Sequence, residues 1–211
     1  MTGTSTPGWW ERRVVPRLVD ATLRGPEIDE RREKVCAGLS GRVLELGFGS
    51  GLNTPFYPVE VDSVDAVEPS DLGWERSEAR REGSAKPVHR VGLDGQALDA
   101  DDEAYDAVLS TFTLCTIPDV ELALQEVRRV LRPGGTFHFL EHGSGPTERI
   151  RRWQRRMEPI QRRVAGGCHL TRDVPHLADA ADLQVTMLEQ DFLGGPGFMR
   201  PWTYLSLGRA S

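Results

Sequence analysis

Short apolar strands alternate with helical segments through the middle of the sequence, and this alternation constrains the fold most. The predicted strands are residues 42–46, 63–68, 87–91, 105–111 and 136–142. Strands that alternate with helices over about a hundred residues imply a parallel sheet that is covered by helices on both faces. Right-handed crossovers leave few topologies for such a sheet. We therefore expect an α/β fold.

The helix predicted before the fifth strand has the clearest signal in the sequence. Asp119 can cap its first turn, and the run Arg132-Pro133-Gly134-Gly135 ends it. Its apolar residues recur at spacings of three and four, which gives one buried face: Val120, Ala123, Leu124, Val127, Val130 and Leu131. A more polar helix is expected over residues 70–82.

The segments outside this central region are expected to be helical, with two further strands near the end of the chain. The predicted helices are 9–23, 27–39, 147–164 and 172–181, and the strands lie near 183–189 and 203–209. Residues 191–201 are expected to form an aromatic loop. We expect one domain, with an N-terminal helical lid (1–40), a ligand-binding core (41–142), a helical cover (143–182) and C-terminal strands (183–211).

Composition excludes several classes of protein. The apolar fraction of 38% can fill a core, and the net charge of −6 disfavours binding to nucleic acid by neutralising phosphates. Three cysteines lie far apart without a CxxC pair, so neither a disulfide framework nor a structural metal site is expected. The N-terminus does not resemble a signal peptide, and no apolar run approaches the roughly 20 residues of a membrane span. These features predict a cytoplasmic protein.

A glycine-rich turn follows the first predicted strand. The segment Glu45-Leu46-Gly47-Phe48-Gly49-Ser50-Gly51 has the spacing GxGxG, with Asn53 where the GxGxxG of dinucleotide enzymes would have its last glycine. A carboxylate at Glu45 would repel a pyrophosphate and attract an ammonium group. A ligand that carries an amino acid and an adenosine, S-adenosylmethionine (SAM), therefore fits this turn better than NAD.

Polar residues at the ends of the next strands extend this candidate site. Glu68 lies at the tip of the second strand, where an acid can accept hydrogen bonds from both ribose hydroxyls. Asp94 follows the third strand and could accept from the exocyclic amine of adenine. The candidate cofactor-binding residues are Glu45, Gly47, Phe48, Gly49, Gly51, Asn53, Glu68, Pro69, Asp94, Gly95, Gln96 and Thr111.

In these motifs the sequence resembles the class I SAM-dependent methyltransferases over roughly residues 41–142. The run Gln125-Glu126-Val127-Arg128-Arg129-Val130-Leu131-Arg132-Pro133-Gly134-Gly135 resembles the helix and turn before the fifth strand of that superfamily. The resemblance implies a Rossmann-like fold with SAM as cofactor. It also implies a seven-stranded, mostly parallel sheet whose last strand is antiparallel, with helices on both faces.

Three further segments are similar to the thiol S-methyltransferases called methyltransferase-like 7 and their bacterial relatives. They are Leu114-Cys115, Glu141-His142 and Gly167-Cys168-His169-Leu170-Thr171-Arg172. Those membrane-associated relatives carry an apolar N-terminal anchor, which this sequence does not show. The resemblance implies methyl transfer to a small acceptor, with a thiol or sulfide as first choice. Alternatives are a lipid, quinone or other acceptor, an NAD(P)-dependent oxidoreductase, and a SAM-binding protein without catalysis.

The candidate catalytic residues follow the fifth strand. His142 is expected to act as a base or an orienting group for the acceptor, with Glu141 orienting it; the alternative is a strand-end histidine bonded to a nearby loop. Cys115 is expected to be a small core residue, and the adjacent Cys168 and His169 make a poor metal pair. Thr171-Arg172 either caps the following helix or contacts a ligand.

The helix predicted over residues 147–164 is rich in arginine. Its arginines form either a solvated face or a surface for an anionic partner, such as lipid headgroups or RNA. Trp9 and Trp10 add weight to lipid, or they form a lid over the acceptor pocket. We expect a small-molecule acceptor, no nucleic acid and possible peripheral contact with a membrane, and leave the oligomeric state open.

Overall fold

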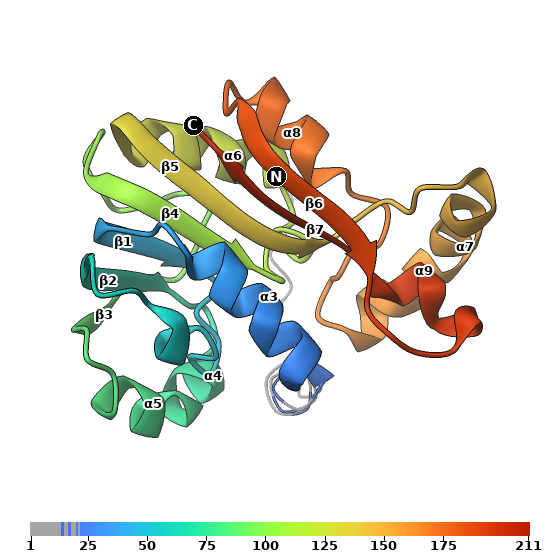
Figure 1. The fold of residues 1–211 in the computed structure, drawn as a ribbon, viewed down its shortest axis with the longest axis horizontal. Helices are drawn as coiled ribbons and strands as arrows, with labels where there is room; N and C mark the ends of the chain where they lie inside the picture. Colours follow the sequence, from blue (N-terminus) through green and yellow to red (C-terminus); the bar gives the residue numbers. More distant parts are fainter. Residues whose placement is uncertain (1–13, 15–16, 18–19, 21) are drawn as a thin grey trace, which may run out of the picture.

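The computed structural model describes residues 14, 17, 20 and 22–211. In this part of the chain, seven strands form one sheet in the order β3-β2-β1-β4-β5-β7-β6 (Figure 1). The strands are β1 (Gly41–Leu46), β2 (Val61–Val67), β3 (Val88–Gly92), β4 (Tyr105–Thr111), β5 (Leu131–His142), β6 (Val185–Phe192) and β7 (Tyr204–Ala210). Strands β1 to β5 pair in parallel, and β7 runs antiparallel to both of its neighbours. The expected sheet is confirmed.

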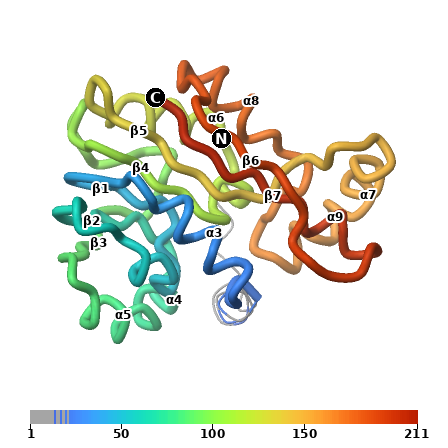
Figure 2. Tube along the Cα trace, in the orientation of Figure 1, coloured from blue at the N-terminus to red at the C-terminus, as the bar shows by residue number. Residues whose placement is uncertain are grey.

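Helices cover both faces of the sheet. The helices are α3 (Pro26–Cys36), α4 (Asp71–Arg76), α5 (Glu78–Glu82), α6 (Val120–Val130), α7 (Glu148–Val164), α8 (Val174–Ala180) and α9 (Arg200–Thr203), with 3₁₀ turns at Thr54–Phe56 and Gly197–Met199. Helices α6 and α8 pack on one face and α3 packs on the other. In Figures 1 and 2, α7 and α9 lie side by side, away from the sheet.

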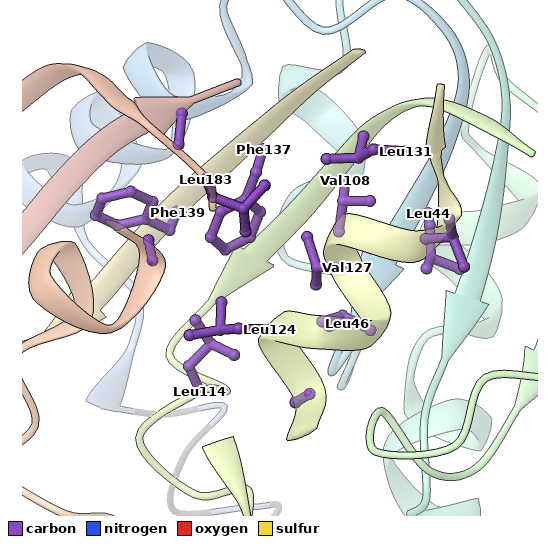
Figure 3. Packing of buried hydrophobic residues seen from close by; sticks show 14 of the residues in the cluster. Leu44, Leu46, Val108, Leu114, Leu124, Val127, Leu131, Phe137, Phe139 and Leu183 are labelled. Atoms are coloured by element: carbon purple, nitrogen blue, oxygen red, sulfur yellow. The ribbon is translucent and has the colours of Figure 1, made fainter. Parts of the chain in front are cut away.

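The core confirms the predicted amphipathic helix. Asp119 accepts a hydrogen bond from the Leu122 amide at 3.0 Å, which caps α6. Figure 3 shows the apolar face of α6, including Leu124 and Val127, against side chains of the sheet. The burial of this face holds the carboxyl ends of the central strands in fixed positions.

Several predicted boundaries were wrong. The helix expected over 70–82 is divided into α4 and α5 at the buried Ser77, whose hydroxyl bonds back to the Trp74 carbonyl. Strand β5 begins at Leu131, because the stretch expected as a turn forms an irregular start to the strand. The loop expected over 191–201 contains the end of β6, a 3₁₀ turn and the start of α9. The helix expected over 9–23 lies largely outside the described residues.

Candidate functional site

The order of the strands places a candidate site at the carboxyl ends of β1 and β4. These strands are neighbours in the sheet, and the chain leaves them toward opposite edges. In α/β sheets, ligands bind where the strand order reverses in this way. The loops that follow β1 and β4 therefore line the expected binding position.

The glycine-rich turn after β1 has the backbone geometry that its sequence predicts. Gly47, Gly49 and Gly51 have φ angles of 69°, 58° and 75°, which disfavour other residues. A Cβ on Gly47 would overlap the side chain of Thr113, in the loop after β4. A Cβ on Gly49 would find no atom closer than the Gly47 carbonyl oxygen at 3.9 Å. Gly47 therefore allows the two loops to touch, and Gly49 leaves open space beside the turn.

The side chain of Phe48 packs against the glycine-rich turn. Its ring is buried and lies 5.6 Å from the ring of Trp74. A Cβ on Gly51 would approach the Phe48 ring to 3.2 Å. Phe48 therefore packs between the turn and α4, which leaves its backbone as the part that can face a ligand.

Glu45 lies beneath the turn in a buried hydrogen-bond network. Its carboxylate accepts from Asn53 Nδ2 at 2.8 Å and from the Tyr57 hydroxyl. Asn53 Nδ2 also donates to Thr111 Oγ1 at 3.0 Å, which links the network to the end of β4. Burial raises the pKa of Glu45 to about 7, against the opposing effect of these hydrogen bonds. Glu45 can therefore act on a ligand through its charge.

Arg32 is a member of this network that the sequence analysis missed. Its guanidinium is buried, donates to Asn53 Oδ1 at 2.5 Å and to Thr111 Oγ1 at 3.2 Å, and lies over the ring of Phe112. Among the described residues its Nε has no hydrogen-bond partner. Arginine on a polar helix predicts a solvated side chain, so nothing local in the sequence indicates this position.

Glu68 joins the tip of β2 to the turn. Its two carboxylate oxygens accept from the Gly49 amide at 2.6 Å and from the Ser70 amide at 2.7 Å. Burial raises the pKa of Glu68, although these backbone hydrogen bonds oppose the shift. The neighbouring Pro69 is exposed. The carboxylate therefore lies at the tip of β2 beside Gly49, and its hydrogen bonds hold the turn in shape.

The loop after β3 lies next to the end of β1. Asp94 Oδ1 accepts from the amide and the side chain of Gln96, both at 2.9 Å, and Asp94 is exposed. A Cβ on Gly95 would lie 3.3 Å from Ile117 and 3.6 Å from Leu46. Glycine therefore lets this loop approach the loops after β1 and β4, as the candidate site requires.

Glu141 holds the loop after β4 in place. Its Oε1 accepts from Ser110 Oγ, the Thr113 amide and the Leu114 amide at 2.8–3.0 Å, and its Oε2 accepts from the Cys115 amide at 3.4 Å. The carboxylate is fully buried, which raises its pKa. These partners place Glu141 as a positioning residue for the loop.

His142, Cys115 and Cys168 converge at the end of β5. The Nδ1 atom of His142 lies 3.9 Å from the sulfur of each cysteine, and the three polar atoms lie within 4.8 Å of one another. The Phe112 ring packs against the imidazole, with 5.2 Å between ring centres. This cluster could not be predicted from spacing, because the two cysteines lie far apart in the sequence. Its only signal is that all three residues lie in the segments that resemble the thiol S-methyltransferases.

The three groups of this cluster shift one another's pKa values. Hydrogen bonds from Cys115 and His142 lower the pKa of Cys168, against the effect of burial. The pKa of Cys115 is raised by its hydrogen bond to Cys168 and by burial. Burial disfavours the charged imidazole, but the interactions with Cys168 outweigh it and raise the pKa of His142. Each shift depends on the other groups of the cluster, so the three side chains titrate as a unit.

The residues after Cys168 have structural partners. His169 Nδ1 lies 3.0 Å from a Glu158 oxygen, and Thr171 also binds the Glu158 carboxylate. Arg172 donates to the carbonyl oxygens of Leu114 and Pro118. Of the two roles expected for Thr171-Arg172, capping of the next helix was wrong, because Asp173 accepts from the His176 amide and caps α8.

Comparisons with known proteins agree with this geometry. The family model described as "Methyltransferase domain" matches residues 44–139. The chain is 34% identical over 161 residues to the thiol S-methyltransferase TMT1B of Rattus norvegicus, covering 74% of this chain and 66% of that protein. It is 33% identical over 154 residues to human TMT1A, a thiol S-methyltransferase, covering 65% of this chain and 58% of that protein. The chain thus spans less than two thirds of the length of these relatives.

The fold is shared with solved structures at lower identity. A SAM-dependent methyltransferase from Leishmania major matches with a TM-score of 0.69 and 18% identity, covering 97% of this chain and 83% of that chain. Within the described residues, no helix is long and apolar enough to cross a membrane.

Proposed function

This chain belongs to the class I methyltransferases, and from this membership we propose that it transfers a methyl group from SAM to the sulfur of a small thiol or sulfide. The observation that carries the proposal is the turn at the switch point of the sheet. There Gly49 leaves open space beside the turn that follows β1. The thiol S-methyltransferase relatives support a sulfur acceptor.

The residues at this edge fit SAM. We propose that the Gly47–Gly51 turn holds its methionine part, that Glu68 accepts from its ribose hydroxyls, and that the Asp94–Gln96 loop lies beside its adenine. Each Glu68 oxygen accepts one backbone amide, so further lone pairs are available to a ligand. When bound, SAM supplies a methyl group that its sulfonium already activates.

The residues of the chain have three tasks in this reaction. The turn and the loop after β4, which Glu141 holds by its backbone amides, fix the cofactor relative to the acceptor. Residues 143–182 bring Cys168 and Arg172 to the acceptor side and exclude water. We propose that His142 meets the acceptor sulfur as a base or orienting group. A thiol is partly ionised at neutral pH and needs modest help.

The proposal is tested by measuring S-adenosylhomocysteine formation from SAM. The assay uses a panel of small thiols, with a phenol, an amine and a phospholipid as alternative acceptors. Turnover with thiols alone is the expected result. SAM binding without thiol turnover would overturn the sulfur acceptor and favour a lipid, quinone or other acceptor.

A matched pair of variants tests the cofactor position. Gly49→Val fills the open space beside the turn and should abolish SAM binding in calorimetry. Gly134→Val introduces the same side chain at a position whose φ is also positive, at the far end of the sheet, and should retain binding. Equal affinity in both variants would remove the turn from the cofactor site.

We also propose that α7 contacts an anionic lipid surface. The helix carries seven arginines against two glutamates, and Trp153, Ile160 and Val164 are 51%, 56% and 41% exposed along it. A basic helix with exposed apolar side chains is typical of peripheral membrane contact.

All three cysteines are free, which supports a reducing compartment such as the cytoplasm.

A further inference from the structure

The cluster at the end of β5 has the composition of a metal site. Two thiol sulfurs and one imidazole nitrogen come from three segments that are separate in sequence: Cys115 after β4, His142 at the end of β5, and Cys168 after α7. Two cysteines and one histidine form a known ligand set for zinc, in which a fourth position stays open. Nothing in the activity proposed above requires two buried cysteines beside this histidine.

The distances suit one ion. Zinc bonds of about 2.3 Å to sulfur and about 2.0 Å to nitrogen, arranged tetrahedrally, place the ligand atoms about 3.5–3.8 Å apart. The imidazole nitrogen lies 3.9 Å from each sulfur, and no pair of ligand atoms exceeds 4.8 Å. The distances between the ligand atoms therefore need to shorten by a few tenths of an ångström to about 1 Å for the site to close around an ion.

The backbone holds the three ligands together. Gly166 and Gly167 have φ angles of 59° and 90°, which turn the chain back after α7, and a Cβ on Gly167 would approach the Thr116 carbonyl to 3.3 Å. The His169 amide then donates to the Cys115 carbonyl at 2.7 Å. Glycine at this turn allows the close approach, and the main-chain hydrogen bond next to Cys168 holds its segment against Cys115.

The cluster adjoins the cofactor site. Cys115 lies in the same loop as Thr113, whose hydroxyl is 3.5 Å from the Gly47 carbonyl oxygen. The Phe112 ring contacts both the imidazole and the Arg32 guanidinium. A ligand in the open position of the ion would therefore lie near the end of β4, where the acceptor is expected.

We propose that Cys115, His142 and Cys168 bind one zinc-class divalent ion, and that the fourth position of this ion takes the acceptor sulfur as a thiolate. The role of the ion toward the acceptor rests on the proposed function, and the metal site itself does not. In this arrangement His142 is the orienting group of that reaction and not its base, because its ring nitrogen binds the ion. On binding, the acceptor S–H bond breaks, its proton passes to solvent, and a metal–sulfur bond forms. The acceptor sulfur then bonds to the methyl carbon as the bond from that carbon to the SAM sulfonium breaks, which leaves a thioether and S-adenosylhomocysteine. Zinc is soft enough to favour sulfur over oxygen acceptors.

Metal analysis and cobalt substitution test the site without any turnover. The full chain, purified with a phosphine reductant and no chelator, should contain about one zinc ion per chain. Cobalt should give a thiolate charge-transfer band and the visible bands of a tetrahedral ion. Added zinc should raise the melting temperature of the chelator-treated protein. A protein that binds neither ion, or whose Cys115 and Cys168 are found only as a disulfide under these conditions, would overturn the site.

Variants assign the ligands. Cys115→Ser, His142→Gln and Cys168→Ser should each weaken cobalt binding at least roughly ten-fold and change the spectrum. Cys36→Ser is the matched control, because Cys36 is fully buried on α3 and is not part of the cluster. If Cys36→Ser lost the metal as the cluster variants did, the assignment would fail. If one variant does not fold, the cobalt spectrum of the wild-type protein still tests whether thiolates bind the ion.

A thiol titration separates the acceptor role from the metal site. Adding 2-mercaptoethanol to the cobalt protein should strengthen the charge-transfer band, whereas ethylene glycol should leave it unchanged. A spectrum that does not respond to the thiol would overturn the acceptor role and keep the metal site. Absence of thiol methylation in the S-adenosylhomocysteine assay would instead count against the proposed function. It would not count against the metal site, because the metal measurements do not depend on turnover.

Discussion

At the scale of single residues, buried charges at the sheet edge control the site. Glu45, Arg32 and Glu68 are each at most 5% exposed, and each is held by polar partners on neighbouring segments. Charges act strongly in such surroundings because water does not screen them. Their contribution to cofactor binding should therefore be measurable one residue at a time.

Glu45 should make SAM binding depend on pH. Its pKa is about 7 in the protein, so below that pH the carboxyl is largely protonated, and a cationic ligand must displace the proton. Affinity should therefore rise as the pH increases through about 7 and level off above it. Calorimetry in buffers of different ionisation enthalpy measures the released proton. Glu45→Gln should abolish that release, and an unchanged release in the variant would assign the proton to another group.

Glu68→Ala should weaken SAM binding at least roughly ten-fold, because hydrogen bonds to a carboxylate are lost and the Gly49 amide loses its partner. The control is Asp71→Ala, since Asp71 lies three residues away and its side chain is 84% exposed. Calorimetric affinity that is the same for both variants would exclude Glu68 from the ribose site.

At the scale of elements, α7 differs from the other helices of the described chain. Its buried polar contact is Gln154, which donates to the carbonyl oxygens of Gly143 and Pro201 and so attaches α7 to the body. Much of its remaining surface carries arginines and exposed apolar side chains. Arginine stems can cover apolar surface on a solvated helix, so the lipid contact needs a direct test.

Vesicle sedimentation provides that test. The protein should bind vesicles that contain phosphatidylserine at low salt and release them at high salt, because the attraction is electrostatic. Trp153→Ala with Ile160→Ser should reduce binding several-fold. Val59→Ser is the control, because Val59 is 82% exposed but lies outside α7. If the α7 variant and this control bound equally well, the helix would not be the contact surface.

At the scale of the whole molecule, the position of β7 between β5 and β6 completes the sheet. Its Gly208 pairs with Phe139 of β5 and with Leu188 of β6. A Cβ on Gly208 would overlap the Phe139 ring, which belongs to the core beneath α6 and α8. The antiparallel strand β7 therefore needs a residue without a side chain at this paired position.

Gly208→Ala should lower the free energy of unfolding by about 1–3 kcal/mol, because a methyl group would be forced into a packed core. The urea midpoint of unfolding measures this change. Gly197→Ala is the control, since a Cβ there would meet no atom within 4 Å. A Gly208→Ala variant as stable as this control would show that the strand can shift to accept the side chain.

The sequence was enough to predict the parallel strands of the sheet, the buried face of α6 and the turn at the end of β1. Each depends on local patterns, namely apolar periodicity, a cap at Asp119, and glycines where φ is positive. The three-dimensional arrangement was needed to show that Arg32 joins the Glu45 network, that Glu141 binds loop amides, and that Cys115, His142 and Cys168 lie together. These contacts join residues that are at least 21 positions apart in the sequence. Such contacts depend on how strands and loops converge at one edge, and no local pattern encodes that convergence.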